Sequence, residues 1–151
     1  MYFFNLKFQG KTALITGSGT GIGKAIATKF VENGASVIIL GRRRGPLDEA
    51  AKELEQIISE KNSAASVKIF AGVDVADETA MNAMFDALKN DNVNIDYIIN
   101  NAGVSGPVTC FPNSPLKDFK STIAIHLTGT FWGSVQALKV MKEGGKIITI
   151  S

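Results

Sequence analysis

Five short stretches of the chain are dominated by apolar and β-branched residues. TALIT and SVIIL are examples, and neither shows the three- or four-residue spacing of an amphipathic helix. Such stretches are typical of the central strands of a parallel sheet, which are covered on both faces. We therefore predict strands over residues 12–16, 36–40, 67–71, 95–99 and 146–150.

The segments between these strands carry apolar residues at helical spacing. In the first segment, Ile22, Ile26 and Phe30 are spaced four apart, which predicts one buried face, and Gly34 suits the left-handed end of a helix. In the last segment, Ser114 is expected to cap the helix, with Pro115 at its first position. The predicted helices cover residues 22–33, 47–61, 78–89 and roughly 115–141.

Strict alternation of strands and helices predicts the fold class. A crossover between parallel strands has to lay a helix over the sheet, so the pattern predicts a doubly wound parallel α/β sheet. No repeat or linker interrupts it, and residues 1–151 are expected to form one domain.

Composition and charge argue against nucleic-acid binding, a zinc site and a membrane location. A net charge of +2 is too small to indicate a nucleic-acid partner. One cysteine, Cys110, and one histidine, His126, cannot assemble a Cys/His zinc site, so no metal is expected. The opening MYFFNL is far shorter than a membrane span and lacks the features of a secretory signal. These observations favour a cytoplasmic protein without a membrane partner.

A glycine-rich turn follows the first predicted strand and leads into the first helix. This is the position where backbone N–H groups and the helix dipole bind an anion such as a pyrophosphate. The alternative is a glycine-rich turn without a ligand. The candidate cofactor-binding residues here, in the pattern TGxxxGIG that begins at Thr16, are Gly17, Ser18, Gly19, Thr20, Gly21, Ile22 and Gly23.

With this motif, the chain resembles the classical short-chain dehydrogenase/reductase family. Asp74-Val75 after the third strand and Asn100-Asn101-Ala102-Gly103 after the fourth match two further motifs of that family. The resemblance implies a Rossmann-like sheet whose last strands lie beyond this chain. It also implies that Asn101, Ala102 and Gly103 line a cofactor groove and that Asp74 hydrogen-bonds the adenine amino group. The same residues also suit turns and caps on their own account.

The end of the second strand bears on the choice of cofactor. An NAD site usually places an acid there for the ribose 2′-hydroxyl, whereas an NADP site supplies arginine for the 2′-phosphate. Gly41 stands in the acid's place and Arg42 follows it, with Arg43 next in the chain. The sequence therefore favours NADP(H) over NAD(H), with a solvated basic loop as the alternative.

The resemblance implies that most catalytic residues lie outside this chain. The family uses a serine, a tyrosine and a lysine that follow the fifth strand, and Ser151 is the residue before the expected serine. His126 stands where the family has an asparagine. It is expected to take that residue's part, to relay a proton itself near neutral pH, or to serve only as a helix histidine bound to backbone. Residues 1–151 alone are expected to be inactive.

Two classes of function follow. The first is an NADP(H)-dependent oxidoreductase that transfers a hydride to a carbonyl of a small molecule, such as a 3-oxoacyl or other acyl-thioester-linked substrate, including that of a malonyl-CoA reductase. The second is a non-catalytic dinucleotide-binding module or regulatory sensor. The resemblance further implies a homo-oligomer of the full-length protein, paired through the long helix predicted over residues 115–141 and the helix that follows it in the family.

Overall fold

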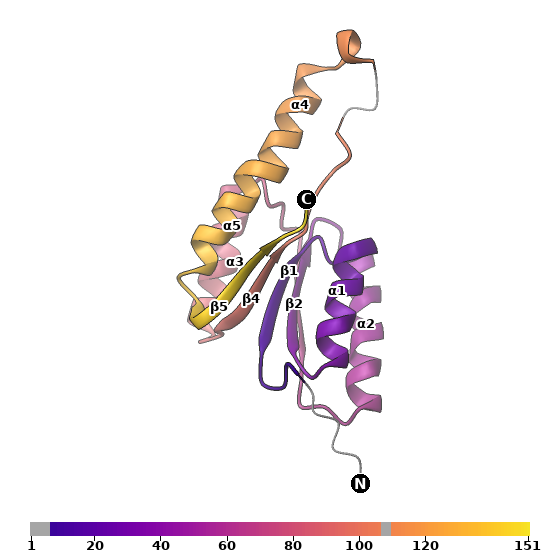
Figure 1. Cartoon of the computed structure of the whole chain (residues 1–151), viewed down its shortest axis with the longest axis vertical. Coiled ribbons are helices and arrows are strands. Elements are labelled where there is room, and N and C mark those ends of the chain that lie inside the picture. The colour runs from indigo at the N-terminus through magenta and orange to yellow at the C-terminus, as the bar shows by residue number, and fades with distance from the viewer. Residues whose placement is uncertain (1–6, 107–109) are drawn as a thin grey trace.

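A single parallel sheet of five strands organises the molecule (Figure 1). The computed structural model describes residues 7–106 and 110–151. The order of the strands is β3-β2-β1-β4-β5, so the chain reverses its direction of winding between β1 and β4. The five strands are β1 Thr12–Thr16, β2 Ser36–Gly41, β3 Val67–Ala71, β4 Ile95–Asn100 and β5 Met141–Thr149.

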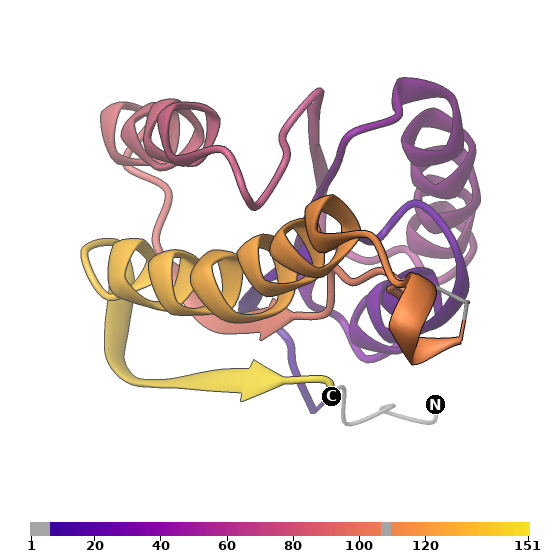
Figure 2. The same cartoon turned by 90° about the horizontal axis from the view of Figure 1, so that it is seen from above.

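Helices cover both faces of the sheet. Figures 1 and 2 show α1 and α2 on one side and α3 with α5 on the other. A long helix projects beyond the sheet and consists of α4, one π-helical turn (η2) and α5 without a break. The helices are α1 Gly21–Glu32, α2 Arg44–Glu60, α3 Glu78–Asn90, η1 Phe111–Asn113, α4 Leu116–Ile123, η2 Ala124–Thr128 and α5 Gly129–Ala137. The doubly wound Rossmann-like fold predicted from the sequence is confirmed.

The alternation of side chains along each strand divides the core into two layers. Ala13 and Ile15 pack with Phe30 of α1 and Leu54 of α2. Leu14, between them in β1, faces the opposite layer, which α3 supplies with Met81, Met84, Phe85 and Leu88. All of these side chains are buried, which explains why the strands are apolar on both faces.

Two predictions about the helices are wrong in detail. Ile22 does not share the buried face of α1: it is 63% exposed, because the first turn of α1 extends past the carboxyl end of the sheet, and Ala27 and Val31 are buried instead. Ser114 is not the cap of α4, since Pro115 occupies that position.

The end of the long helix also differs from its prediction. The helix stops at Ala137, four residues earlier than expected, because a short turn carries the chain directly into β5. The N–H group of Ile95 donates a hydrogen bond to the carbonyl of Val140 at 2.9 Å. Val140, which was expected in the helix, therefore pairs with the start of β4 instead.

A buried carboxylate ties three strands together at the amino edge of the sheet, far from the strand ends where ligands bind. Asp96 accepts hydrogen bonds from the Thr12 N–H at 2.9 Å, from Lys11 Nζ at 3.0 Å and from Lys142 Nζ at 3.3 Å. Burial raises the pKa of Asp96, but these three donors together outweigh it and hold the pKa below its ordinary value. The carboxylate therefore stays charged and links β1, β4 and β5.

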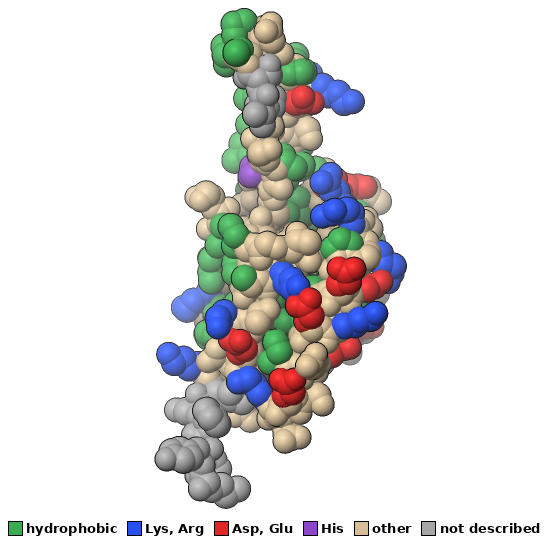
Figure 3. Space-filling view, turned by 90° about the vertical axis from the view of Figure 1, so that its right-hand side faces the viewer, with side chains coloured by type: hydrophobic (Ala, Val, Ile, Leu, Met, Phe, Trp, Pro, Cys, Tyr) green, Lys and Arg blue, Asp and Glu red, His purple; other side chains and the backbone are tan. Residues whose placement is uncertain are grey.

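The outer face of the α1 and α2 layer is polar. Figure 3 shows basic and acidic side chains interspersed over it, as on an ordinary solvated face. No helix in the described ranges 7–106 and 110–151 is both long enough and apolar enough to span a bilayer.

Candidate dinucleotide-binding cleft

A cleft of about 440 Å³ opens at the carboxyl ends of the strands. It lies where β1 separates β2 from β4, the switch point of the sheet, which is the place where open α/β folds bind their ligands. Four loops that are distant in the sequence form its walls. The predicted site residues that line it are Gly17, Gly19, Thr20, Ile22, Gly41, Arg42, Arg43, Asp74, Val75, Asn101, Ala102, Gly103 and His126.

Two glycines of the turn after β1 allow backbones to approach closely. Gly17 has φ of +64°, and a Cβ atom there would lie 2.8 Å from the Cα of Ala102. A Cβ at Gly23 would lie 2.5 Å from both the Gly17 carbonyl oxygen and Asn101 Nδ2. Side chains at either position would separate the turn from the loop after β4. Gly23 thus serves the site by packing behind the turn, outside the cleft lining.

Ser18 also supports the site from behind. Its side chain is fully buried, with Oγ donating to the Ile15 carbonyl at 2.8 Å and accepting from the Leu40 N–H at 3.0 Å. The hydroxyl therefore fastens the turn to the end of β2. Gly21, at φ of +55°, starts α1 and does not line the cleft either.

Thr16 has a structural role that the sequence analysis did not assign. Its Oγ1 accepts hydrogen bonds from the N–H groups of Asn101 at 2.9 Å and Ala102 at 2.8 Å. In return, Asn101 Nδ2 donates to the carbonyls of Thr16 at 2.9 Å and Gly17 at 3.2 Å. The Asn101 side chain is thus directed into the glycine turn, while Ala102 and Gly103 continue along the cleft. The threonine that opens TGxxxGIG was the available signal.

An ion pair crosses the wall of the cleft between the loops after β2 and β3. Arg42 Nη1 lies 3.8 Å from Asp74 Oδ2, and Asp74 Oδ1 accepts a hydrogen bond from the Ala76 N–H at 3.0 Å. Asp74 therefore closes a turn, as one of the sequence alternatives expected, while it also faces the cleft.

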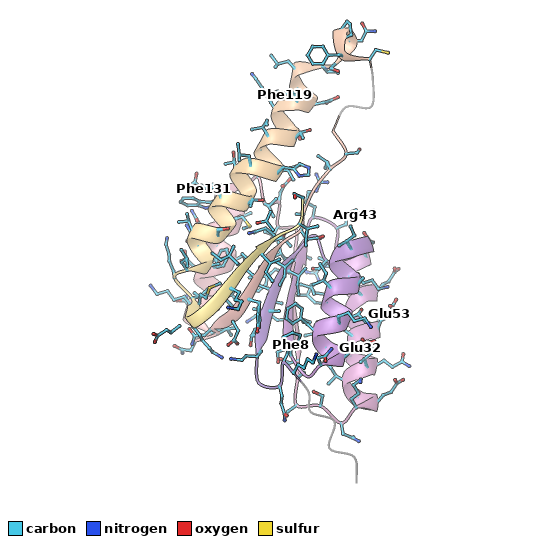
Figure 4. All side chains as sticks on the ribbon, viewed as in Figure 1. Phe8, Glu32, Arg43, Glu53, Phe119 and Phe131 are labelled. Atoms are coloured by element: carbon cyan, nitrogen blue, oxygen red, sulfur yellow. The ribbon has the colours of Figure 1, made fainter. Side chains whose placement is uncertain are left out.

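The next arginine in the chain lies at the start of α2. Arg43 is the N-cap residue of that helix, and Figure 4 shows it at the upper end of the helical layer, beside the strand ends. The first turn of α2 carries no acidic side chain beside it.

His126 joins the long helix to the cleft. It lies in the π-helical turn, and its Nε2 is 3.0 Å from the N–H nitrogen and 2.8 Å from the carbonyl oxygen of Val104. In one tautomer of the imidazole, Nε2 accepts a hydrogen bond from the Val104 N–H group; in the other, it donates one to the Val104 carbonyl. The ring also packs on Gly103, where a Cβ would lie 2.7 Å from its Cε1. The imidazole therefore holds the loop after β4 through backbone.

The remaining candidates lie away from the cleft lining. Ser151 is exposed just beyond β5, where the Ile150 N–H donates to the Asn100 carbonyl at 2.9 Å. Cys110 is exposed and forms no disulfide with any residue that the structure describes. Within the described part of the chain, no three His, Cys, Asp or Glu side chains gather as a metal ion would require.

Comparison with known proteins adds the family. The family model described as short chain dehydrogenase matches residues 11–151. The chain belongs to this family. It is 31% identical over 148 residues to a 3α-hydroxysteroid dehydrogenase of Mediterraneibacter gnavus, covering 97% of this chain and 57% of the relative. It is 33% identical, with the same two coverages, to the 3-oxoacyl-(acyl-carrier-protein) reductase of Aquifex aeolicus.

Solved structures agree on the fold. A short-chain type dehydrogenase/reductase from Mycobacterium marinum superposes with a TM-score of 0.84 at 30% identity, over 96% of this chain and 57% of the other. The chain therefore spans little more than half the length of the relatives it matches.

Two further solved structures that resemble this chain contain a dinucleotide cofactor. A short chain dehydrogenase from Burkholderia cenocepacia in complex with NADP is 26% identical with a TM-score of 0.82, over 94% of this chain and 55% of the other. An NAD+-bound xylitol dehydrogenase is 30% identical with a TM-score of 0.79, over 95% and 53%. Both dinucleotides thus occur among the structural relatives of this chain.

Proposed function

We propose that the full-length protein is an NADP(H)-dependent oxidoreductase and that residues 1–151 supply its dinucleotide-binding part. The observation that carries the proposal is the wall of the cleft after β2. Gly41 brings no carboxylate there, whereas Arg42 and Arg43 bring two guanidinium groups. This wall adjoins the glycine turn, so one extended ligand can reach both.

The residues present fit the adenosine and pyrophosphate of the cofactor. The turn after β1 leads into α1, whose first turn carries no acidic side chain, so its free N–H groups suit an anion. Asp74 and Val75 lie beside Arg42 on the same cleft, where an adenine base would be bound. The planar fork of Arg42 suits the 2′-phosphate, because it can donate two parallel hydrogen bonds to phosphate oxygens.

When bound, the cofactor supplies the hydride for a carbonyl or receives it from an alcohol. The part of this chain is to place the cofactor. The Thr16 and Asn101 hydrogen bonds hold the glycine turn against the loop after β4, and His126 fixes the continuation of that loop at Val104. In this proposal, proton transfer to the substrate oxygen falls to the tyrosine that the family resemblance places after the fifth strand, and Ser151 stands one residue before the expected serine that orients this oxygen.

The substrate is a small molecule with a carbonyl or alcohol group. A 3-oxoacyl thioester is the first candidate, because a relative at 33% identity is a 3-oxoacyl reductase. Malonyl-CoA-type substrates share the thioester. The 3α-hydroxysteroid dehydrogenase at 31% identity makes a 3-ketosteroid the second compound to test.

The test compares NADPH and NADH oxidation by the full-length protein on these compounds, followed by the absorbance of the reduced nicotinamide. Turnover with NADPH at lower KM than with NADH supports the proposal. Equal KM values for both cofactors refute the NADP(H) preference. Tight NADPH binding without turnover of any carbonyl would instead favour a dinucleotide-binding module or sensor.

The long helix supports a homo-oligomer. Phe119, Ile123, Leu127 and Phe131 recur every four residues along it, and all are between 40% and 65% exposed. Figure 4 shows Phe119 on α4 and Phe131 on α5, along the projecting helix. An apolar stripe of this length needs a cover. We propose that the same helix of a second copy supplies it, as the family resemblance implies.

A further inference from the structure

The pairing of β2 with β3 brings Arg42 and Asp74 together at the carboxyl ends of these two strands. Arg42 directly follows β2 and Asp74 comes shortly after β3, and the two strands are paired in register up to Gly41 and Ala71. Any cofactor that occupies the wall after β2 therefore meets a guanidinium that already faces a carboxylate at 3.8 Å.

The two partners are not equally free to move. Asp74 is held by its hydrogen bond to the Ala76 N–H, and its side chain is 36% exposed. The Arg42 side chain is 62% exposed, and its contact with Asp74 is an ion pair without hydrogen-bond distance. A ligand can thus draw the guanidinium away, while the carboxylate stays at the cleft.

We propose that Asp74 is a specificity-determining residue, which competes with the 2′-phosphate of the cofactor for Arg42 and so limits the preference for NADP(H). The inference rests on the proposed function. Two effects act in the same direction. The phosphate has to replace the carboxylate as the partner of Arg42, and the retained carboxylate repels the phosphate charge across the cleft.

Exposure sets the size of the effect. Ion pairs between exposed side chains change an equilibrium by up to about fivefold, and repulsion between a phosphate and a nearby carboxylate adds a similar factor. We expect the preference for a 2′-phosphate to rise about threefold to tenfold when Asp74 loses its charge.

The experiment is a double-mutant cycle with Arg42→Ala and Asp74→Asn in the full-length protein. The probes are adenosine 2′,5′-bisphosphate and adenosine 5′-monophosphate, titrated by calorimetry. Because both contain adenine and the 5′-phosphate, the ratio of their Kd values cancels any change in adenine binding. Asparagine keeps an oxygen that accepts from Ala76, so the turn is preserved.

The chain offers a matched control. Arg44 and Asp48 form an exposed ion pair of 3.7 Å between the first residue of α2 and a residue one turn later, and neither residue lines the cleft. Asp48→Asn removes the same charge from the same basic segment. It should leave the ratio of Kd values within about twofold, since only general screening changes.

The outcomes are distinct. The proposal expects Asp74→Asn to raise selectivity for the bisphosphate, and to raise it less in the Arg42→Ala background. An equal gain in both backgrounds would mean simple repulsion and would overturn the competition. No gain, in a protein that does prefer the bisphosphate, would overturn the inference and leave the proposed function standing. If the unmutated protein shows no preference for the bisphosphate, the NADP(H) assignment itself fails.

Discussion

Replacing His126 by alanine should loosen the loop that carries the cofactor-facing residues after β4. The imidazole is the side chain that reaches from the long helix to the backbone of Val104, at 2.8 Å from the carbonyl and 3.0 Å from the N–H. It also packs on Gly103, whose missing side chain leaves the room for the ring. Alanine keeps the helix but removes both contacts.

The structure bounds the magnitude. One hydrogen bond between His126 and Val104 is lost, which is worth about 0.5–1.5 kcal/mol because water can replace it at this exposed position. This corresponds to a loss of about twofold to tenfold in kcat/KM. Asparagine presents both a donor and an acceptor, so it can satisfy either group of Val104. His126→Asn should therefore retain more activity than His126→Ala and stay within about tenfold of the unmutated enzyme.

The assay measures kcat and KM for NADPH separately, in the full-length protein, for both variants. A positioning residue should act mainly on KM for NADPH and should be rescued by asparagine. Lys120→Ala is the control, since Lys120 lies exposed on the same long helix and neither lines the cleft nor belongs to the apolar stripe. A loss of several hundredfold in kcat with His126→Asn would refute this reasoning, because it would show that the imidazole performs chemistry that an amide cannot.

The remaining predictions address the cofactor, the sheet, the long helix and catalysis. Arg42→Ala should reduce the preference for NADPH over NADH about fivefold to fiftyfold in Kd, because in the unmutated protein the gain from the phosphate contact is partly offset by the loss of the Arg42–Asp74 ion pair; unchanged selectivity would contradict the assignment. Asp96→Asn should destabilise the fold by about 1–3 kcal/mol at neutral pH in denaturant titrations. Because the pKa of Asp96 is lowered in the folded state, this stabilisation is complete above the ordinary carboxyl value of 3.8 and is lost as the pH falls through the folded pKa, so the two proteins should converge in acid. Phe131→Glu should weaken self-association of the full-length protein in sedimentation, whereas Lys120→Glu, at an exposed position outside the apolar stripe, should not. Residues 1–151 alone should turn over none of the carbonyl compounds, and turnover comparable to that of the full-length protein would show that proton transfer does not depend on later residues.

The sequence alone determined the elements and the edge of the sheet at which ligands bind. Apolar β-branched runs predicted the places of all five strands. For β1, β2 and β4 the reason is that a strand covered on both faces needs apolar side chains throughout. β5 is an edge strand with largely exposed side chains, and it begins at Met141, five residues before its predicted start. Gly17 and Gly23 could also be predicted as site residues from the sequence, because close backbone contacts at these positions leave no room for a side chain and therefore require glycine.

Only the tertiary structure decided what each side chain of the motifs faces. Ser18 and Asn101 belong to cofactor motifs, yet the side chains of both form hydrogen bonds with backbone groups and so hold the glycine turn in place. Ile22 has helical spacing with Phe30, yet it lies at the open cleft, because the sheet ends below the first turn of α1. Spacing along one helix carries no information about where the neighbouring sheet stops.

The contacts that matter most for selectivity and positioning join residues that are far apart in the chain. Arg42 meets Asp74 across two strands, and His126 meets Val104 across a loop and a helix. Neither pairing has a local signal, since each depends on strand order, register and the π-helical turn together. Local chemistry therefore determined which residues form the cleft, and the packing of the sheet and its helices determined which of them act on one another.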